Sequence, residues 1–89
     1  MKRNSIIGAR RAIVSPEVRR RVDLTLLIVD RIHSILEEKG LKQKDLASML
    51  GKIESEISKW MRGTHNFTID TITSIENALG TPILQIATD

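Results

Sequence analysis

The sequence has no cysteine among its 89 residues, and Trp60 and Phe67 are its only tryptophan and phenylalanine, with no tyrosine. Without cysteine there is neither a disulfide framework nor a thiolate metal site, which fits a reducing cytosol. Apolar runs are short, and the longest, Leu24 to Val29, is interrupted by Thr25. This is far below the ~20 residues that span a bilayer. The basic N-terminus lacks the apolar run of a signal peptide, so we expect a cytoplasmic protein with no membrane partner.

Residues that could catalyse a reaction or bind a metal are equally few. Asp23 and Asp30 lie seven residues apart on one helical face, but no nucleophile or base accompanies them. His65 has no second histidine or cysteine near it in sequence, and His33 falls beside an apolar stripe, where a partly buried histidine is the simpler interpretation. We therefore expect no enzyme, no metal and no cofactor. A chain of this length suits one domain with a modest core.

Positive charge is concentrated at the N-terminus. Residues 1–21 hold seven basic side chains and one acidic one, a net charge of +6, whereas residues 22–89 hold seven basic and ten acidic ones, a net charge of −3. Basic arms commonly follow nucleic-acid backbones, although a solubilising tail explains the charge as well. We expect residues 1–15 to form a flexible basic arm and residues 16–89 to form the folded domain.

The helix signals begin at Ser15-Pro16-Glu17, an N-cap hydroxyl followed by proline at the first helical position and an acid in the first turn. This helix should run to about Lys39, with Gly40 as its stop. Two adjacent apolar stripes cover it: Val18, Val22, Leu26, Val29, Ile32 and Leu36, then Leu24, Ile28 and Ile35. Together they are wider than the stripe that a surface helix buries. The helix should therefore contact both its own core and a partner.

Short helices and short connections follow Gly40. We predict helices over about 43–50 and 54–62, a loop over 63–67, and a fourth helix that starts at an N-cap Thr68 and ends at Gly80. The inward stripe of the fourth helix is Ile69, Ile72, Ile75 and Leu79. Pro82 should begin a short fifth helix through Ile86. No segment has the alternation of a strand, so the fold class is all-α with five helices and an extended N-terminal helix.

Residues 43–63 form the most informative segment. One short helical pattern ends at Gly51, and the next starts almost at once and ends at Gly63. The apolar side chains that face inward across this tight turn are Leu46, Ala47, Leu50, Ile57, Trp60 and Met61. What stays outward on the second helix is small, polar or basic, and Trp60 and Phe67 serve as core anchors. This arrangement is typical of a helix-turn-helix, here about residues 43–62, with a recognition helix for the DNA major groove.

The segment Leu41 to Gly51, with Leu-Ala-x-x-Leu-Gly at its end, and the segment Ile57 to Gly63 resemble the Cro/cI-type helix-turn-helix family, also called XRE-like regulators. The resemblance covers about residues 28–86 and implies a lambda-repressor-like domain that binds double-stranded DNA. Gln43 matches the phosphate-anchoring glutamine of the family. The positions that match the base-reading row are Glu54, Ser55, Ser58 and Lys59. Those expected at the DNA backbone, besides Gln43, are Lys42, Lys44, Lys52, Arg62, Thr64, His65 and Asn66.

Three departures from the family pattern have structural consequences. Lys42 stands where serine or threonine usually caps the first helix of the unit, Ile53 replaces the polar cap of the second helix and is expected to pack inward, and Met61 replaces a frequent acidic residue. Glu54 and Glu56 also bring negative charge toward DNA. That weakens nonspecific binding and leaves more of the electrostatic attraction to the basic side chains.

Two function classes follow from the sequence. The first is a sequence-specific transcriptional regulator, a repressor that acts as a homodimer on a two-fold operator. The alternative is an antitoxin that binds a toxin protein and represses its own operon, because the N-terminal extension resembles that of HigA-type antitoxins. A third hypothesis is a fold that has lost DNA binding and only mediates protein contacts, which the carboxylates Glu54 and Glu56 keep open.

Overall fold

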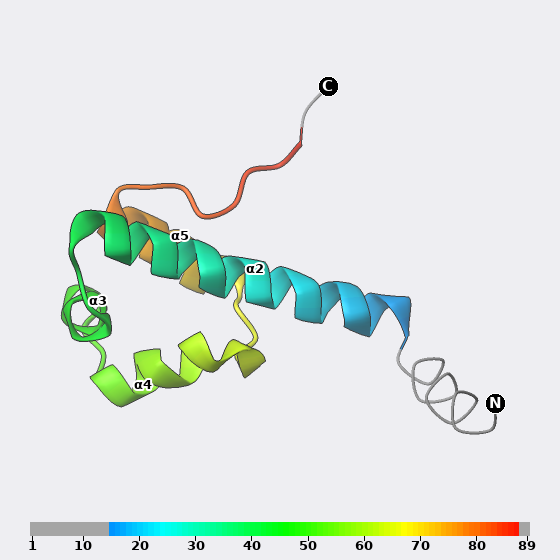
Figure 1. Cartoon of the computed structure of the whole chain (residues 1–89), viewed down its shortest axis with the longest axis horizontal. Coiled ribbons are helices and arrows are strands. Elements are labelled where there is room, and N and C mark those ends of the chain that lie inside the picture. Colours follow the sequence, from blue (N-terminus) through cyan, green and yellow to red (C-terminus); the bar gives the residue numbers. More distant parts are fainter. Residues whose placement is uncertain (1–14, 88–89) are drawn as a thin grey trace.

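The computed structural model describes residues 15–87, which form four α-helices and no strand (Figure 1). The elements are α2 (Pro16–Lys39), α3 (Gln43–Leu50), α4 (Glu54–Lys59) with a π-helical turn η1 (Trp60–Thr64) directly after it, and α5 (Ile69–Leu79). In Figure 1, α2 is the longest helix, and its N-terminal end runs beyond the other helices. The all-α class and the bounds predicted for the first two helices are confirmed.

The ends of α2 are set by the local signals in the sequence. The Ser15 hydroxyl accepts a hydrogen bond from the Val18 amide at 3.1 Å, which satisfies one of the free N–H groups of the first turn. At the other end Gly40 is left-handed, with φ of 67°. The Leu41 amide then donates to the Leu36 carbonyl at 2.8 Å, which closes the helix in the pattern of a Schellman motif.

The core lies where the four helices meet. Its fully buried side chains are Ile32 and Ile35 from α2, Leu46 from α3, Ile57 from α4 and Ile75 from α5. Trp60 and Leu79 are also buried in this cluster, and Phe67 packs against it half-buried. Among residues 15–87 no polar or charged side chain is buried. The fold is therefore held together by apolar packing, and the predicted anchoring roles of Trp60 and Phe67 are confirmed.

The N-terminal half of α2 extends past this core. Its first buried side chain is Ile28, and every large apolar residue before it is at least partly exposed. The exposed set is Val18, Val22, Leu24, Leu26 and Leu27. The stripe predicted from the sequence thus divides into a buried C-terminal part and an uncovered N-terminal part.

The predicted fifth helix is wrong, because residues 81–87 are not helical. Three of their backbone groups are bonded to side chains of α2 and α5. Glu76 of α5 accepts hydrogen bonds from the amides of Ile83 at 2.6 Å and Leu84 at 3.1 Å. Arg31 of α2 donates to the Pro82 carbonyl through Nε at 3.2 Å and Nη2 at 3.0 Å. A stretch this short gains little from a helical nucleus, and these contacts hold it in an extended path with Ile83 in the core.

Three further expectations about exposure are wrong. Ile69, placed in the inward stripe of the last helix, is 71% exposed, because it occupies the first turn of α5, outside the core. Ile53 is 68% exposed rather than packed inward. It is the N-cap of α4 with extended backbone, which points its side chain away from the helix contact. His33 is exposed on α2 rather than partly buried.

The basic arm predicted for residues 1–15 lies, apart from Ser15, outside the described residues. Within the described part of the chain no helix is both long enough and apolar enough to cross a membrane.

Gly63 is the glycine whose substitution tests this architecture most directly. Its φ is +85°, and a Cβ added there would lie 2.8 Å from Leu26 Cδ2 of α2. Leu26 is 47% exposed, so the end of its side chain can swing into solvent. We therefore expect Gly63→Ala to lower the free energy of unfolding by about 1–2 kcal/mol, the cost of a left-handed L-residue.

Gly40→Ala is the matched control in urea unfolding. Gly40 has φ of +67° and nothing within 4 Å of the added Cβ. Gly40→Ala therefore costs only the free energy of placing an L-residue at positive φ. Similar losses for both variants are expected. A loss at Gly63 several-fold larger than at Gly40 would show that Leu26 cannot move, and that η1 and α2 are packed more rigidly than their exposure indicates.

Candidate nucleic-acid interface

The turn between α3 and α4 has the geometry that the sequence predicts. Gly51 is left-handed with φ of 67°, and the Lys52 amide donates back to the Ala47 carbonyl at 2.8 Å. Ala47 is buried at the contact between α3 and α4, and its small side chain permits the two helices to approach closely. Glycine at the turn avoids the steric penalty of positive φ. The chain therefore reverses over a few residues and presents α4 on the surface.

The outward face of α4 carries most of the predicted base-reading row. Glu54, Ser55 and Lys59 are exposed, and Ser58 is half-buried. The opposite face is anchored by Ile57, which is fully buried, and by Trp60, which directly follows the helix. Since α4 has six residues, too few for a stable isolated helix, this burial holds the outward row in place.

The helix does not end at Arg62, as predicted, but widens into the π-helical turn η1 and bends at Gly63. Arg62 and Thr64 are exposed on this turn, and Asn66 is exposed on the loop that follows. The three side chains predicted at the DNA backbone thus continue along the surface from the C-terminal end of the recognition helix.

A second group of predicted backbone contacts lies at the N-terminus of α3. Lys42 and Lys44 are exposed and Gln43 is half-buried. The Asp45 carboxylate accepts a hydrogen bond from the Lys42 amide at 2.8 Å, which is the N3 half of a capping box, while Lys42 itself supplies no side-chain cap. The free amides of this helix start and the flanking lysines form a surface suited to an anion.

Lys52 and Glu56 form an ion pair that the sequence interpretation did not include. Lys52 Nζ lies 3.1 Å from Glu56 Oε2, and it also lies 5.7 Å from the Trp60 ring centroid. The i,i+4 spacing of the two residues was a signal for this pair. Such an exposed pair contributes at most about 1 kcal/mol to stability. It does compensate the charge of Glu56, whereas Glu54, at the start of the recognition helix, forms no ion pair with the residues that the structure describes.

His65 belongs to an aromatic cluster rather than to an open surface. Its ring stacks on Trp60 with centroids 5.1 Å apart and meets Phe67 edge-on at 4.8 Å. The Nε2 atom is buried and has no hydrogen-bond partner among residues 15–87. Desolvation lowers the pKa of His65, with Glu56 raising it and Lys52 lowering it by smaller amounts. The lowered pKa favours the neutral imidazole at pH 7, and the Nε2 atom is buried.

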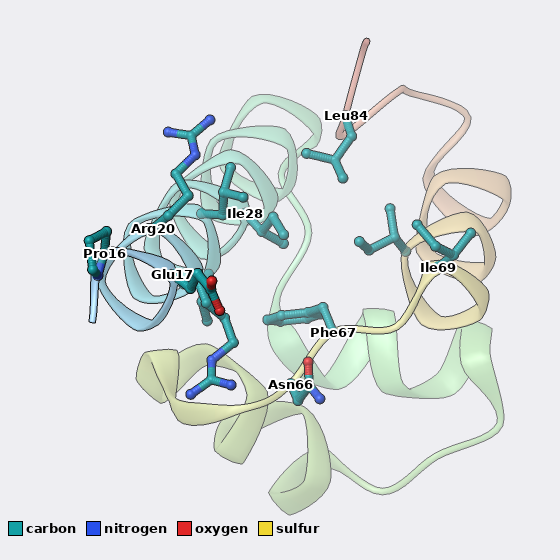
Figure 2. A pocket seen from close by; sticks show the side chains of 12 residues that line it. Pro16, Glu17, Arg20, Ile28, Asn66, Phe67, Ile69 and Leu84 are labelled. Carbon is teal, nitrogen blue, oxygen red and sulfur yellow. The ribbon is translucent and has the colours of Figure 1, made fainter. Parts of the chain in front are cut away.

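No three His, Asp or Glu side chains in the described range gather closely enough to hold a metal ion. An apolar groove of about 630 Å³ does lie between the N-terminal half of α2, the loop at Phe67, the start of α5 and Leu84 (Figure 2). Leu24, Ile28 and Ile72 line it as well, and Arg20 stands at its rim. Sequence periodicity could not reveal this groove, because its walls come from three separate segments.

The lowered pKa of His65 makes stability depend on pH. In the unfolded chain His65 takes up a proton near its ordinary pKa of 6.5, whereas the folded chain does so only at lower pH. The unfolded state then binds more protons, so stability falls as pH drops through 6.5, until the folded pKa is passed. His65→Phe keeps a ring between Trp60 and Phe67 but removes this titration.

We expect the wild type to lose stability relative to His65→Phe as pH falls from about 7.5 to 5.5, in urea unfolding at each pH. In the difference between their free energies of unfolding, the effect of titrating the carboxylates that both proteins share cancels. A relative gain by the wild type over this interval would mean that the fold stabilises the charged imidazole, contrary to the burial of Nε2.

Comparison with known proteins agrees with this geometry. A helix-turn-helix family model matches residues 32–86, more than half of the chain, and the match includes α3, the turn at Gly51, α4 and α5. No curated protein and no solved structure gave a significant match to the chain. The buried anchors, the tight turn and the exposed helix face all lie inside the matched residues. The chain belongs to the Cro/cI-type, XRE-like helix-turn-helix family of DNA-binding transcription regulators.

Proposed function

We propose that the protein is a sequence-specific transcriptional repressor that acts as a homodimer on a two-fold DNA operator. The observation that carries this proposal is the row Ser55, Ser58 and Lys59 on α4, of which Ser55 and Lys59 are exposed. Because the other side of that helix is locked by Ile57 and Trp60, the row is held rigidly enough to distinguish one base pair from another.

Each side chain of the row has a defined task in the major groove. Lys59 donates to the O6 and N7 acceptors of guanine, and Ser55 and Ser58 both donate and accept. Glu54 accepts from the amino group of cytosine and repels sites that lack it. The short serines let the backbone of α4 approach the base edges, and Lys59 reaches further at the C-terminal end of the helix.

The backbone contacts bracket this row on both sides. Lys42, Gln43 and Lys44 at the start of α3 hold one phosphate segment, and Lys52 adds charge at the turn. Arg62, Thr64 and Asn66 hold the segment that follows the recognition helix, with His65 contributing to the shape of the loop. Such contacts set the register of the protein on the duplex, while the α4 row selects the sequence.

The proposed homodimer is supported by apolar surface that a single copy leaves open. The groove shown in Figure 2 is lined by no residue of α4, and Leu84 and Ile86 add exposed apolar side chains from the C-terminal segment. Dimerisation there would bury them and place two recognition helices in successive major grooves, about 34 Å apart. Occupation of a promoter would then exclude polymerase, which requires no further domain.

The same groove favours one alternative, an antitoxin that binds a toxin protein and represses its own operon. In that function the N-terminal half of α2 would hold the toxin rather than a second copy. Its uncovered apolar side chains and basic flank, Arg19 to Arg21, provide an extended contact surface.

Lys59→Ala tests the repressor proposal. On a duplex selected from random DNA we expect its affinity to fall roughly 5- to 150-fold, the range for losing one base contact, with relaxed selectivity at one base pair. Affinity of the wild type should also fall steeply with salt. Gel shift and fluorescence anisotropy give both quantities.

Arg20→Ala is the matched control, because it removes one positive charge at the groove rim and not on α4. It should leave the preferred base at every position unchanged. If the wild type binds no duplex even at low salt, the protein is not a DNA-binding regulator and the repressor proposal must be abandoned.

Ile69→Asp tests the dimer. Ile69 is exposed in the first turn of α5, where an acid favours the helix, so the fold should be unaffected. We expect a dimeric wild type and a monomeric variant in sedimentation velocity, and at least a tenfold loss of operator affinity. A wild type that stays monomeric alone and on DNA, but co-purifies with the product of a neighbouring small reading frame, would support the antitoxin instead.

A further inference from the structure

The inward stripe of α2 changes character at its N-terminal end. Ile35, Ile32 and Ile28 are buried at helical spacing, and Thr25 continues the stripe as a half-buried residue. Four residues earlier the same face carries Arg21. A guanidinium therefore occupies the helical position that an apolar side chain would hold if the core continued.

Arg21 lies at a polar hollow of about 510 Å³ beside the end of the recognition helix. One wall is α2, with Arg21, Val22 and Thr25, and the other is the run from Gly63 to Asn66. Leu26, one turn further along α2, lies close to Gly63, so the helix and the loop are held side by side. This hollow is separate from the apolar floor of the groove in Figure 2, although Arg21 and Asn66 stand at the border of both.

The hollow suits an anion. None of its lining residues carries a carboxylate, and burial lowers the pKa of His65, which favours its neutral form at pH 7. The Thr25 hydroxyl donates its proton to the Arg21 carbonyl at 2.8 Å. The Arg21 guanidinium itself makes no hydrogen bond or ion pair with residues 15–87. Its donors and its charge are therefore available, opposite the exposed side chains of Thr64 and Asn66.

We propose that this hollow binds a phosphate of the DNA backbone, with Arg21 as its charged ligand and Thr64 and Asn66 as hydrogen-bond donors. The proposal rests on the proposed DNA-binding function and assigns it a further contact residue. A planar guanidinium matches two phosphate oxygens at once. Arg21 precedes the residues 32–86 that match the family model, so the extension of α2 lengthens the phosphate track beyond the helix-turn-helix itself.

The test compares wild type, Arg21→Gln, Arg21→Lys and Lys39→Gln on two duplexes, one selected from random DNA and one of unrelated sequence. We expect Arg21→Gln to lower affinity about 3- to 10-fold on both duplexes, since a phosphate contact carries no sequence information. The slope of log affinity against log salt should decrease by about one unit. Arg21→Lys should retain most of that slope.

Lys39→Gln is the control, because Lys39 lies in the last turn of the same helix and lines neither the apolar groove nor the hollow. It should leave the salt slope unchanged. Circular dichroism and thermal unfolding of every variant separate lost folding from lost contact. A scan of the selected duplex with single neutral methylphosphonate linkages should find one linkage that weakens the wild type and has no effect on Arg21→Gln.

The outcomes distinguish the two proposals. If the wild type binds neither duplex at low salt, the repressor function fails. If it binds, but Arg21→Gln keeps the wild-type affinity and salt slope, the phosphate site is wrong while the repressor function stands. Equal losses from Lys39→Gln and Arg21→Gln would also overturn the site, since they would show a diffuse effect of charge on α2.

Discussion

The burial of Ile57 and Trp60 is the interaction on which the functional surface depends. Helix α4 has six residues and would not persist alone. Ile57 is fully buried, and Trp60 is buried among the same residues of α2, α3 and α5. This packing fixes the rotation of α4 about its axis, and the rotation decides which side chains face outward. The outward row on this helix is therefore a consequence of the core, not of its own helix propensity.

Helix α2 performs two tasks along its length. Its C-terminal half supplies the largest share of the core, with Ile28, Ile32 and Ile35. Its N-terminal half projects past the core and borders a different hollow on either flank. The flank toward α5 is apolar and suits protein. The flank toward η1 is polar and suits phosphate, because the Arg21 guanidinium has no partner there among residues 15–87. One extended helix thus connects the proposed dimer surface to the proposed DNA surface.

Charge at the interface is arranged for selectivity as much as for attraction. The pair Lys52 and Glu56 compensates itself, and Glu54 leaves a negative charge at the start of the recognition helix. In the proposed DNA-binding mode, attraction comes from the flanks: Lys42 and Lys44 on one side, Arg62 and Arg21 on the other. Since carboxylates near bases penalise wrong partners more than right ones, this layout lowers nonspecific affinity while the flanking cations maintain the association.

Local interactions let the sequence by itself determine the ends of α2, α3 and α5. Ser15, Gly40, Thr68 and Gly80 act within a few residues of their partners, so their caps follow from spacing alone. Only the tertiary structure decided the contacts between segments that lie far apart in the sequence. Glu76 and Arg31 hold residues 82–84 out of a helix, η1 closes a polar hollow against α2, and Ile69 lies beyond the edge of the core. Periodicity cannot supply these outcomes, because it describes one helix face without saying whether another element covers it.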